Sequence, residues 1–217
     1  MAEKQPTRER ILDTALELFN GQRFAKVTTA QIAKTCGIAE GNLWYHFNDR
    51  EALLEGLLER FSRQVAKRLK IVPSEEDVLQ DYASFYLIMA SEIETYRFFY
   101  RDQRDYEGLI GKLSDRLPDL YPSTADQFRL FLTMMRDRGH VDLSDQKLAS
   151  IITISLMIFR YASEFFHEAN ILLSRDPDII NYAFRLHMTL YEDGLSDCAK
   201  RFMTETFELS DFKDHLL

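Results

Sequence analysis

The strongest constraint on the fold of this chain is the spacing of its apolar residues, which recur every three or four positions over almost the whole sequence. This spacing lines one face of an α-helix, whereas a half-buried strand needs alternation at every second residue. No such alternation is sustained. We therefore predict an all-α protein, long enough at 217 residues for a small N-terminal helical domain and a larger C-terminal helical bundle.

The first fifty residues carry signals for three helices and the start of a fourth. The first helix reads "TRERILDTALELF", and the second begins in "VTTAQIAKTC" with a threonine N-cap and ends at Gly37. A very short third helix covers residues 39–45. Asn48 or Asp49 caps a longer fourth helix that ends before Pro73.

The spacing around Gly37 predicts a helix-turn-helix. Ala33 supplies the small residue at which two helices can cross, and Gly37 tolerates the positive φ that a tight turn requires. Leu43 then faces inward. The outward side of the third helix carries the candidate DNA-binding residues Glu40, Gly41, Asn42, Trp44, Tyr45 and His46.

These outward residues suit a DNA groove. Asn42 can make two hydrogen bonds to adenine, and Gly41 lets the backbone approach closely. The rings of Trp44, Tyr45 and His46 can reach phosphates or thymine methyl groups. The spacing also leaves open a plain structural interpretation, in which aromatic residues such as Trp44 and Phe47 cover a core.

The net charge of −8 does not exclude DNA as a partner. Residues 1–50 hold a balance of +1, and residues 51–217 a balance of −9. Solvent ions screen charges that lie more than about 10 Å apart, so the near-neutral head can still present a local positive surface.

Other functional classes lack their signals. We find no nucleophile with a base, no phosphate-binding loop and no metal-ligand spacing, so we expect neither catalysis nor a cofactor nor a metal. Cys36 and Cys198 form no disulfide or thiolate pattern. No apolar run reaches the roughly 18 residues of a membrane span. We expect a cytoplasmic protein without a membrane partner.

The stretch from Arg10 to Leu54 resembles the N-terminal domain of the TetR family of bacterial transcriptional regulators. The shared features are the apolar first helix, the "TT..IA...GI" core and the "GNL.YHF" recognition segment. The resemblance implies a homodimer that binds a palindromic double-stranded DNA operator, and a C-terminal body that senses a small apolar or amphipathic effector. It also implies that Thr29, Tyr45 and Arg50 contact phosphates. Arg50 suits this role physically, because a guanidinium at a helix N-terminus attracts anions.

Three residues depart from the family pattern. Arg23 stands where many members have a glycine, so we expect the turn at Gly21 instead. Ala39 replaces the usual serine cap. Glu40 occupies an exposed site, where a carboxylate weakens binding to phosphates unless it accepts from cytosine N4. The operator sequence is therefore not transferable from relatives.

Capping signals predict where the later helices begin: Ser74 with Asp77, Ser123 with Asp126, Ser144, Asp176 with Pro177, and Gly194 before the last. The segment from Leu148 to Phe166 is apolar nearly all round. We expect it to be buried on two sides, either as a central core helix or as a core helix that also meets a partner subunit.

By its order in the chain, this segment and the helix at 179–191 correspond to the pair through which the family dimerises. The resemblance thus implies a dimer interface at Ile151, Ile154, Ile158, Ile180, Phe184, His187 and Tyr191. An apolar effector pocket would draw on aromatic and methionine side chains, although such stripes are more often plain core. The candidates are Tyr82, Phe85, Tyr86, Met89, Phe98, Phe99, Met134, Met135, Phe159 and Phe166.

We expect a DNA-binding domain at residues 1–50 and a regulatory and dimerisation domain at 51–217, with the fourth helix, at about 49–70, linking them. The expected function is that of a DNA-binding repressor released by a small-molecule effector. The alternative is a TetR-like DNA-binding protein that is controlled by a protein partner or has no small-molecule effector.

Overall fold

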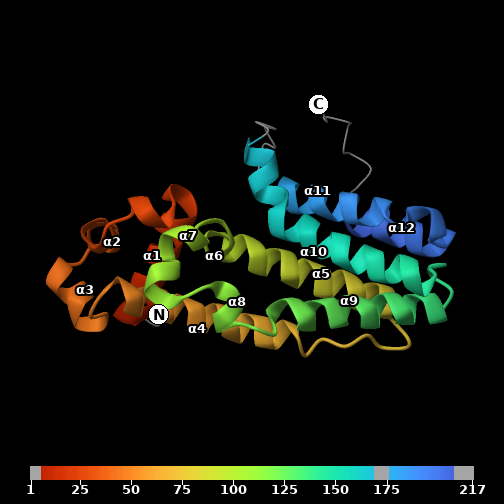
Figure 1. Ribbon diagram of the computed structural model, residues 1–217, viewed down its shortest axis with the longest axis horizontal. Coiled ribbons are helices and arrows are strands. Elements are labelled where there is room, and N and C mark those ends of the chain that lie inside the picture. The colour runs from red at the N-terminus through yellow and green to blue at the C-terminus, as the bar shows by residue number, and fades with distance from the viewer. Residues whose placement is uncertain (1–5, 169–175, 208–217) are drawn as a thin grey trace, which may run out of the picture. The chain divides into compact units, whose positions relative to one another are not determined.

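The computed structural model describes residues 6–168 and 176–207, and every regular element in these ranges is a helix (Figure 1). The prediction of an all-α fold is confirmed. Within the same ranges, an isolated antiparallel bridge links Val141 to Leu195. Among the described helices, none combines the length and apolarity that crossing a bilayer requires.

The chain forms two compact units. Unit 1 comprises residues 1–66 and 92–118, and unit 2 comprises residues 67–91 and 119–217. This division differs from the boundary expected near residue 50, because residues 92–118 return to pack with the N-terminal helices. The helix that follows the recognition segment therefore lies mostly in unit 1.

Unit 1 is built around its first helix. Its helices are α1 (Thr7–Gln22), the short 3₁₀ helix η1 (Phe24–Lys26), α2 (Thr29–Cys36), α3 (Glu40–His46), most of α4 (Arg50–Arg68), α6 (Arg97–Arg101), α7 (Gln103–Ile110) and α8 (Leu113–Arg116). The stripe predicted on α1 is buried at Ile11, Leu12, Ala15 and Phe19, as expected for a core face. In unit 1, α1 packs against α2 and against α6.

Gly56 in α4 allows the side chains of Leu12 and Phe47 to approach the backbone of α4 closely within unit 1. A Cβ at this position would lie 3.0 Å from a methyl carbon of Leu12 and 3.3 Å from the ring of Phe47. Both neighbours are buried, Leu12 in α1 and Phe47 at the end of α3. A glycine inside a helix costs about 1 kcal/mol relative to alanine, and here its missing side chain makes room for this contact.

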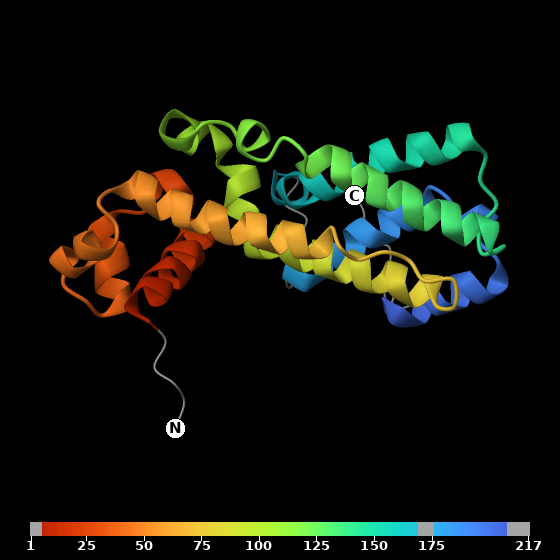
Figure 2. The ribbon, with the colours of Figure 1, turned by 90° about the horizontal axis from the view of Figure 1, so that it is seen from below.

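Unit 2 is a helical bundle (Figure 2). Its helices are most of α5 (Val78–Thr95), α9 (Leu120–Asp137), α10 (Asp145–Glu168), α11 (Asp176–Thr189), the 3₁₀ helix η2 (Glu192–Gly194) and α12 (Asp197–Thr206). The long helix α10 packs against both α9 and α11. Aromatic rings fill the interior: Phe85 stacks on Phe131 with ring centroids 5.0 Å apart, and Tyr86 meets Phe184 at 4.2 Å.

Several predicted helix starts are confirmed. Thr28 caps α2, since its side chain accepts from the Gln31 N–H at 3.1 Å, and Asp49 caps α4 by accepting from the Ala52 N–H at 2.7 Å. The expected cap at Ser144 accepts from the Lys147 N–H at 3.3 Å, and α11 begins at Asp176. The last helix follows Gly194, with Ser196 as its N-cap.

Two predicted helix starts are wrong. Ser123 lies inside α9, which begins at Leu120; this start places Pro122 in the first turn, where its missing N–H is tolerated. Ser74 caps only a turn, and α5 begins later, at Val78. There the backbone N–H and hydroxyl of Ser74 both donate to Asp81, which draws the preceding loop onto the first turn of α5.

Candidate nucleic-acid interface

The predicted helix-turn-helix is present in α2 and α3 of unit 1 (Figure 1). Gly37 joins the two helices with φ 70° and ψ 34°, the left-handed conformation that glycine adopts most readily. The Ile38 N–H then donates to the Ala33 carbonyl at 3.0 Å, which closes the turn. Leu43 is fully buried and anchors α3 to the core of unit 1. The polar side of α3 therefore faces outward.

The outward residues of α3 lie where the sequence predicts them. Glu40, Gly41 and Asn42 are exposed, and Tyr45 is the most exposed aromatic side chain of the helix at 84%. Trp44 is exposed at the margin of this surface, while His46 is half-buried and meets the ring of Tyr45 edge-on, with centroids 5.2 Å apart. Of the two aromatics that the structural interpretation places over a core, Phe47 is buried and Trp44 is exposed. Their contacts with DNA stay a prediction.

Thr29 and Glu40 meet at this surface. The Thr29 hydroxyl donates to a carboxylate oxygen of Glu40 at 3.0 Å, joining the first residue of α2 to the first residue of α3. Ala39, the N-cap residue of α3, provides no side-chain hydrogen bond, in line with its departure from a serine cap. The hydroxyl expected to contact phosphate therefore already has an acidic partner.

Arg50, the residue expected to contact phosphate, makes two contacts with Phe24. Its guanidinium lies over the ring of Phe24, 4.0 Å from the centroid, and donates to the Phe24 carbonyl at 2.5 Å. Partial burial lowers the pKa of Arg50 from its ordinary value. The side chain therefore ties the start of α4 to η1, and its contact with phosphate stays a prediction.

The turn after α1 corrects a second expectation. Gly21 lies inside α1, and the positive φ falls on Arg23, at 72°. Among the described residues, Arg23 is the one non-glycine residue with positive φ. Such a conformation costs on the order of 1–3 kcal/mol and persists where neighbouring contacts hold it.

A buried carboxylate supplies those contacts. Asp102, whose side chain is fully buried, accepts from the Phe24 N–H at 2.7 Å and from Arg101 Nε at 2.7 Å. Arg101 in turn donates to the carbonyls of Phe19 and Asn20, the last-turn acceptors of α1, at 2.7 and 2.8 Å. Residues 97–103 thus hold the segment from which α2 starts. No local sequence signal marks these residues, because their partners lie about 80 positions away along the chain.

The residues predicted for a dimer interface divide into two groups. Ile151, Phe184, His187 and Tyr191 are buried within unit 2, and their part in a dimer interface stays a prediction. Ile158 is half-buried and Ile154 is exposed. The side chain of Ile180 lies outside the described part of the structure.

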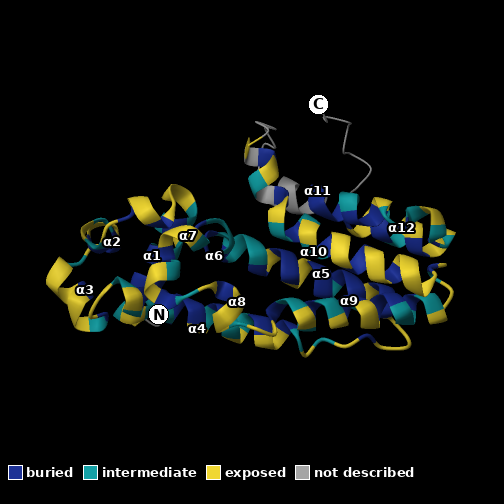
Figure 3. Ribbon diagram, in the orientation of Figure 1, coloured by how far each residue is buried: buried dark blue, intermediate teal, exposed yellow. Residues whose placement is uncertain are grey.

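An exposed apolar stripe instead follows one side of α10. Its members are Ile154, Met157, Tyr161 and Phe165, each 40 to 58% exposed and spaced three or four residues apart. Figure 3 shows exposed segments along this helix in alternation with buried ones. The segment is therefore not buried on both sides within one chain. The stripe therefore leaves four large apolar side chains of α10 uncovered in the single chain.

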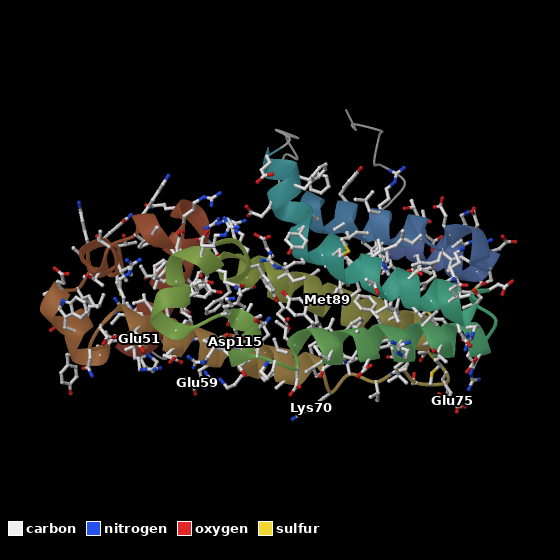
Figure 4. The ribbon with its side chains drawn as sticks, in the orientation of Figure 1. Glu51, Glu59, Lys70, Glu75, Met89 and Asp115 are labelled. Atoms are coloured by element: carbon white, nitrogen blue, oxygen red, sulfur yellow. The ribbon has the colours of Figure 1, made fainter. Side chains whose placement is uncertain are left out.

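The pocket candidates belong to two different units, and all of them except Met134 are buried. Phe98 and Phe99 belong to unit 1, where Phe98 packs against Phe19 with ring centroids 5.2 Å apart. The other eight belong to unit 2. Met89, labelled in Figure 4, is nearly fully buried there, whereas Met134 is half-buried. Their assignment to an effector pocket stays a prediction.

His187 lies at the centre of a buried polar cluster in unit 2. Ser155 donates its hydroxyl proton to the Ile151 carbonyl at 2.6 Å, so its oxygen accepts from His187 Nδ1–H, also at 2.6 Å. The opposite nitrogen, Nε2, then accepts from the Tyr82 hydroxyl, and Tyr191 lies 3.1 Å from the same nitrogen. Burial lowers the pKa of His187 to about 3, so the imidazole is neutral.

Two family models match the sequence. The model described as bacterial regulatory proteins of the tetR family matches residues 11–57, and the model described as a bacterial transcriptional repressor matches residues 60–196. Among curated proteins, the HTH-type transcriptional regulator UidR of Escherichia coli strain K12 is 35% identical over 68 residues. That match spans 31% of this chain and 35% of UidR, about a third of the relative's length.

Solved structures show the same fold. A TetR-family transcriptional regulator from Marinobacter aquaeolei VT8 matches with a TM-score of 0.77 at 19% identity, over 94% of this chain and 98% of that one. SmeT in complex with triclosan matches with a TM-score of 0.60 at 18% identity, over 90% and 94% of the two chains. Since the second family model alone spans more than half of the sequence, the chain belongs to the TetR family of bacterial transcriptional regulators.

Proposed function

We propose that this protein is a repressor that binds a palindromic operator as a homodimer and is released by a small-molecule effector. The observation that carries the proposal is the exposed side of α3, which presents Asn42 and Tyr45 outward while Leu43 holds the helix to its core. Two such helices, one from each subunit, would enter successive major grooves about one DNA turn apart. We assign DNA binding to residues 1–50 and regulation to residues 51–217.

The chemistry of α3 supports a division of roles. Asn42 reads adenine through a bidentate hydrogen-bond pair, and Gly41 lets the backbone approach the bases. Tyr45 and Thr29 donate to phosphates, while Trp44 and His46 contact phosphates or thymine methyl groups. The phosphate contacts would position the protein on the DNA, and the base contacts would recognise the sequence.

The experiment that tests the proposal is selection of bound sequences from a random DNA pool by the purified protein at a stated salt concentration. A palindrome with half-sites about one helical turn apart is expected, since two symmetry-related helices read it. Enrichment of a single unrepeated half-site would contradict the dimeric arrangement. Failure of the folded protein to enrich any sequence would contradict DNA reading by the isolated regulator.

Replacing Asn42 with alanine should weaken binding to the selected operator by about 1–3 kcal/mol, because one bidentate base contact is lost. Selection with the variant should also show relaxed preference at one base position of each half-site. Lys34→Ala, on an exposed part of α2, is the matched control and should retain the base preference. Unchanged affinity and preference in Asn42→Ala would mean that the residue does not touch a base.

The second copy of the chain is the proposed occupant of the α10 stripe. The stripe is exposed in the isolated chain, and it lies on the segment that corresponds to the family's dimerisation helices. Its location also accounts for an otherwise all-apolar segment, because the side that one chain leaves uncovered would be buried by its partner.

Replacing Met157 and Phe165 together with aspartate should yield a monomer that binds the operator at least about 100-fold more weakly, since the two heads no longer bind as one unit. Sedimentation velocity and operator titration measure the two effects. Leu130→Asp, an exposed apolar residue on α9, is the control and should remain dimeric. A dimeric double variant would place the interface elsewhere.

The effector would act through α4. This helix begins beside the recognition segment and ends in unit 2, where Arg68 donates to Gln127 and Thr124 at 3.0 and 3.1 Å. A ligand that moves this end would change the spacing of the two recognition helices. The fold shared with the SmeT–triclosan complex supports a small apolar effector. Thermal shifts against a metabolite panel should identify one, because a ligand that binds only the folded chain raises its melting temperature.

A further inference from the structure

The contact between Thr29 and Glu40 joins the two helices of the proposed DNA reader through their polar side chains. The carboxylate of Glu40 accepts from the Thr29 hydroxyl at 3.0 Å. Thr29 is half-buried and Glu40 is exposed, so this acid lies at the surface of the chain. A phosphate oxygen that approached Thr29 would need the same hydroxyl proton.

Glu40 also stabilises the end of its own helix. It is the acidic residue in the first turn of α3, where backbone N–H groups point outward and favour negative charge. The N-cap position before it is Ala39, which makes no side-chain hydrogen bond. In the free protein the carboxylate therefore has the Thr29 hydroxyl as its donor.

We infer that Glu40 is a specificity-determining residue that suppresses binding to non-operator DNA. The inference rests on the proposed function, since it assigns a role at the same surface. To bind any duplex, Thr29 must exchange the carboxylate for a phosphate, and the displaced charge then faces the DNA backbone. On random sequence this exchange is unfavourable, because phosphates repel the carboxylate at short range.

An operator reverses this penalty where it supplies a donor. In the major groove, the N4 amino group of cytosine donates to a glutamate carboxylate. A cytosine opposite Glu40 would therefore give the displaced acid a new partner, and the exchange would no longer be unfavourable. The same side chain thus lowers the affinity for most sequences but not for the operator. The ratio of the affinity for the operator to the affinity for random DNA therefore increases.

The test compares Glu40→Gln with the wild-type chain on two duplexes of equal length, the selected operator and a random sequence, at one salt concentration. Glutamine keeps the size of the side chain and removes its charge. We expect binding to random DNA to strengthen about tenfold and binding to the operator to strengthen much less, so that the affinity ratio falls. Selection with the variant should also show a weaker cytosine preference in each half-site, because a neutral amide oxygen accepts a weaker hydrogen bond than a carboxylate does.

Two further variants make the result specific. Glu17→Gln removes the same charge from an exposed position on α1. It should change the affinity for the operator and the affinity for random DNA by no more than about twofold. In a Thr29→Val background, Glu40→Gln should strengthen binding to random DNA less than it does alone, because the hydroxyl for which acid and phosphate compete is gone.

The outcomes separate this inference from the proposed function. Equal strengthening on both duplexes would overturn the inference, since Glu40 would then be only a repulsive charge. Equal behaviour of Glu40→Gln and Glu17→Gln would overturn it as well. In either case the wild-type chain would still bind its operator, and the proposed function would stand. A wild-type chain that binds neither duplex would remove both proposals together.

Discussion

Replacing Asp102 with alanine is expected to destabilise unit 1 by about 3–5 kcal/mol, the usual consequence of removing one partner from a buried charge pair. The change leaves the N–H of Phe24 without its acceptor and removes the buried carboxylate to which the Arg101 guanidinium donates. Arg23 also loses the carboxylate 3.8 Å from its own guanidinium, next to its positive φ. The turn that leads into α2 should therefore loosen first.

Urea unfolding followed by fluorescence measures this effect directly, because Trp44 is the single tryptophan of the sequence and lies in unit 1. Asp105→Ala is the matched control. It removes an exposed carboxylate three residues further on and should change the free energy of unfolding by no more than about 0.5 kcal/mol. If both variants unfolded alike, the carboxylate of Asp102 would not hold the turn.

Lowering the pH from 6.5 to 5 should destabilise the protein by about 2 kcal/mol through His187 alone. The imidazole is neutral in the folded chain, where its pKa is about 3, whereas in the unfolded chain it binds a proton below its ordinary pKa of 6.5. The unfolded state therefore gains the proton first as the pH falls. Each pH unit below 6.5 removes about 1.4 kcal/mol, and the loss ends near pH 3.

His187→Gln isolates this contribution. The glutamine amide can still donate to Ser155 and accept from Tyr82, but it does not titrate. We expect the variant to lose stability at pH 7.5 and to show a shallower decline in unfolding free energy between pH 6.5 and 5 than the wild-type chain, at equal protein concentration. Parallel pH profiles for the two proteins would show that another group governs acid sensitivity.

The helix-turn-helix could be predicted from the sequence because its determinants are local. The cap at Thr28, the left-handed turn at Gly37 and the buried Leu43 lie within one short stretch of sequence. Each of them can be recognised from its residue type and its neighbours in that stretch. Periodicity likewise identified the long helices, since a face of apolar side chains spans many turns. Capping signals were less reliable: Ser123 can cap a turn, but Pro122 suits the first turn of a helix that has already begun.

The parts that could not be predicted depend on contacts distant in sequence. The residues near Arg50 in the sequence do not predict that its guanidinium lies over the ring of Phe24. The residues near Arg23 likewise do not predict that the carboxylate of Asp102 lies beside it. The dimer residues show the same difficulty. Periodicity defines an apolar helix in α10, but only packing separates buried Ile151 from exposed Met157.

Gly56 has a consequence for how this protein can evolve. Any side chain at position 56 would press on Leu12 and Phe47, and both neighbours are already enclosed. Phe47 ends the recognition helix, so a shift of its ring would disturb the surface that meets DNA in our proposal. Substitution at position 56 should therefore require a small shift of Leu12 or Phe47, and a smaller residue at position 12 or 47 should make it easier to accept. Among sequences that keep this head, the three positions should vary as a set.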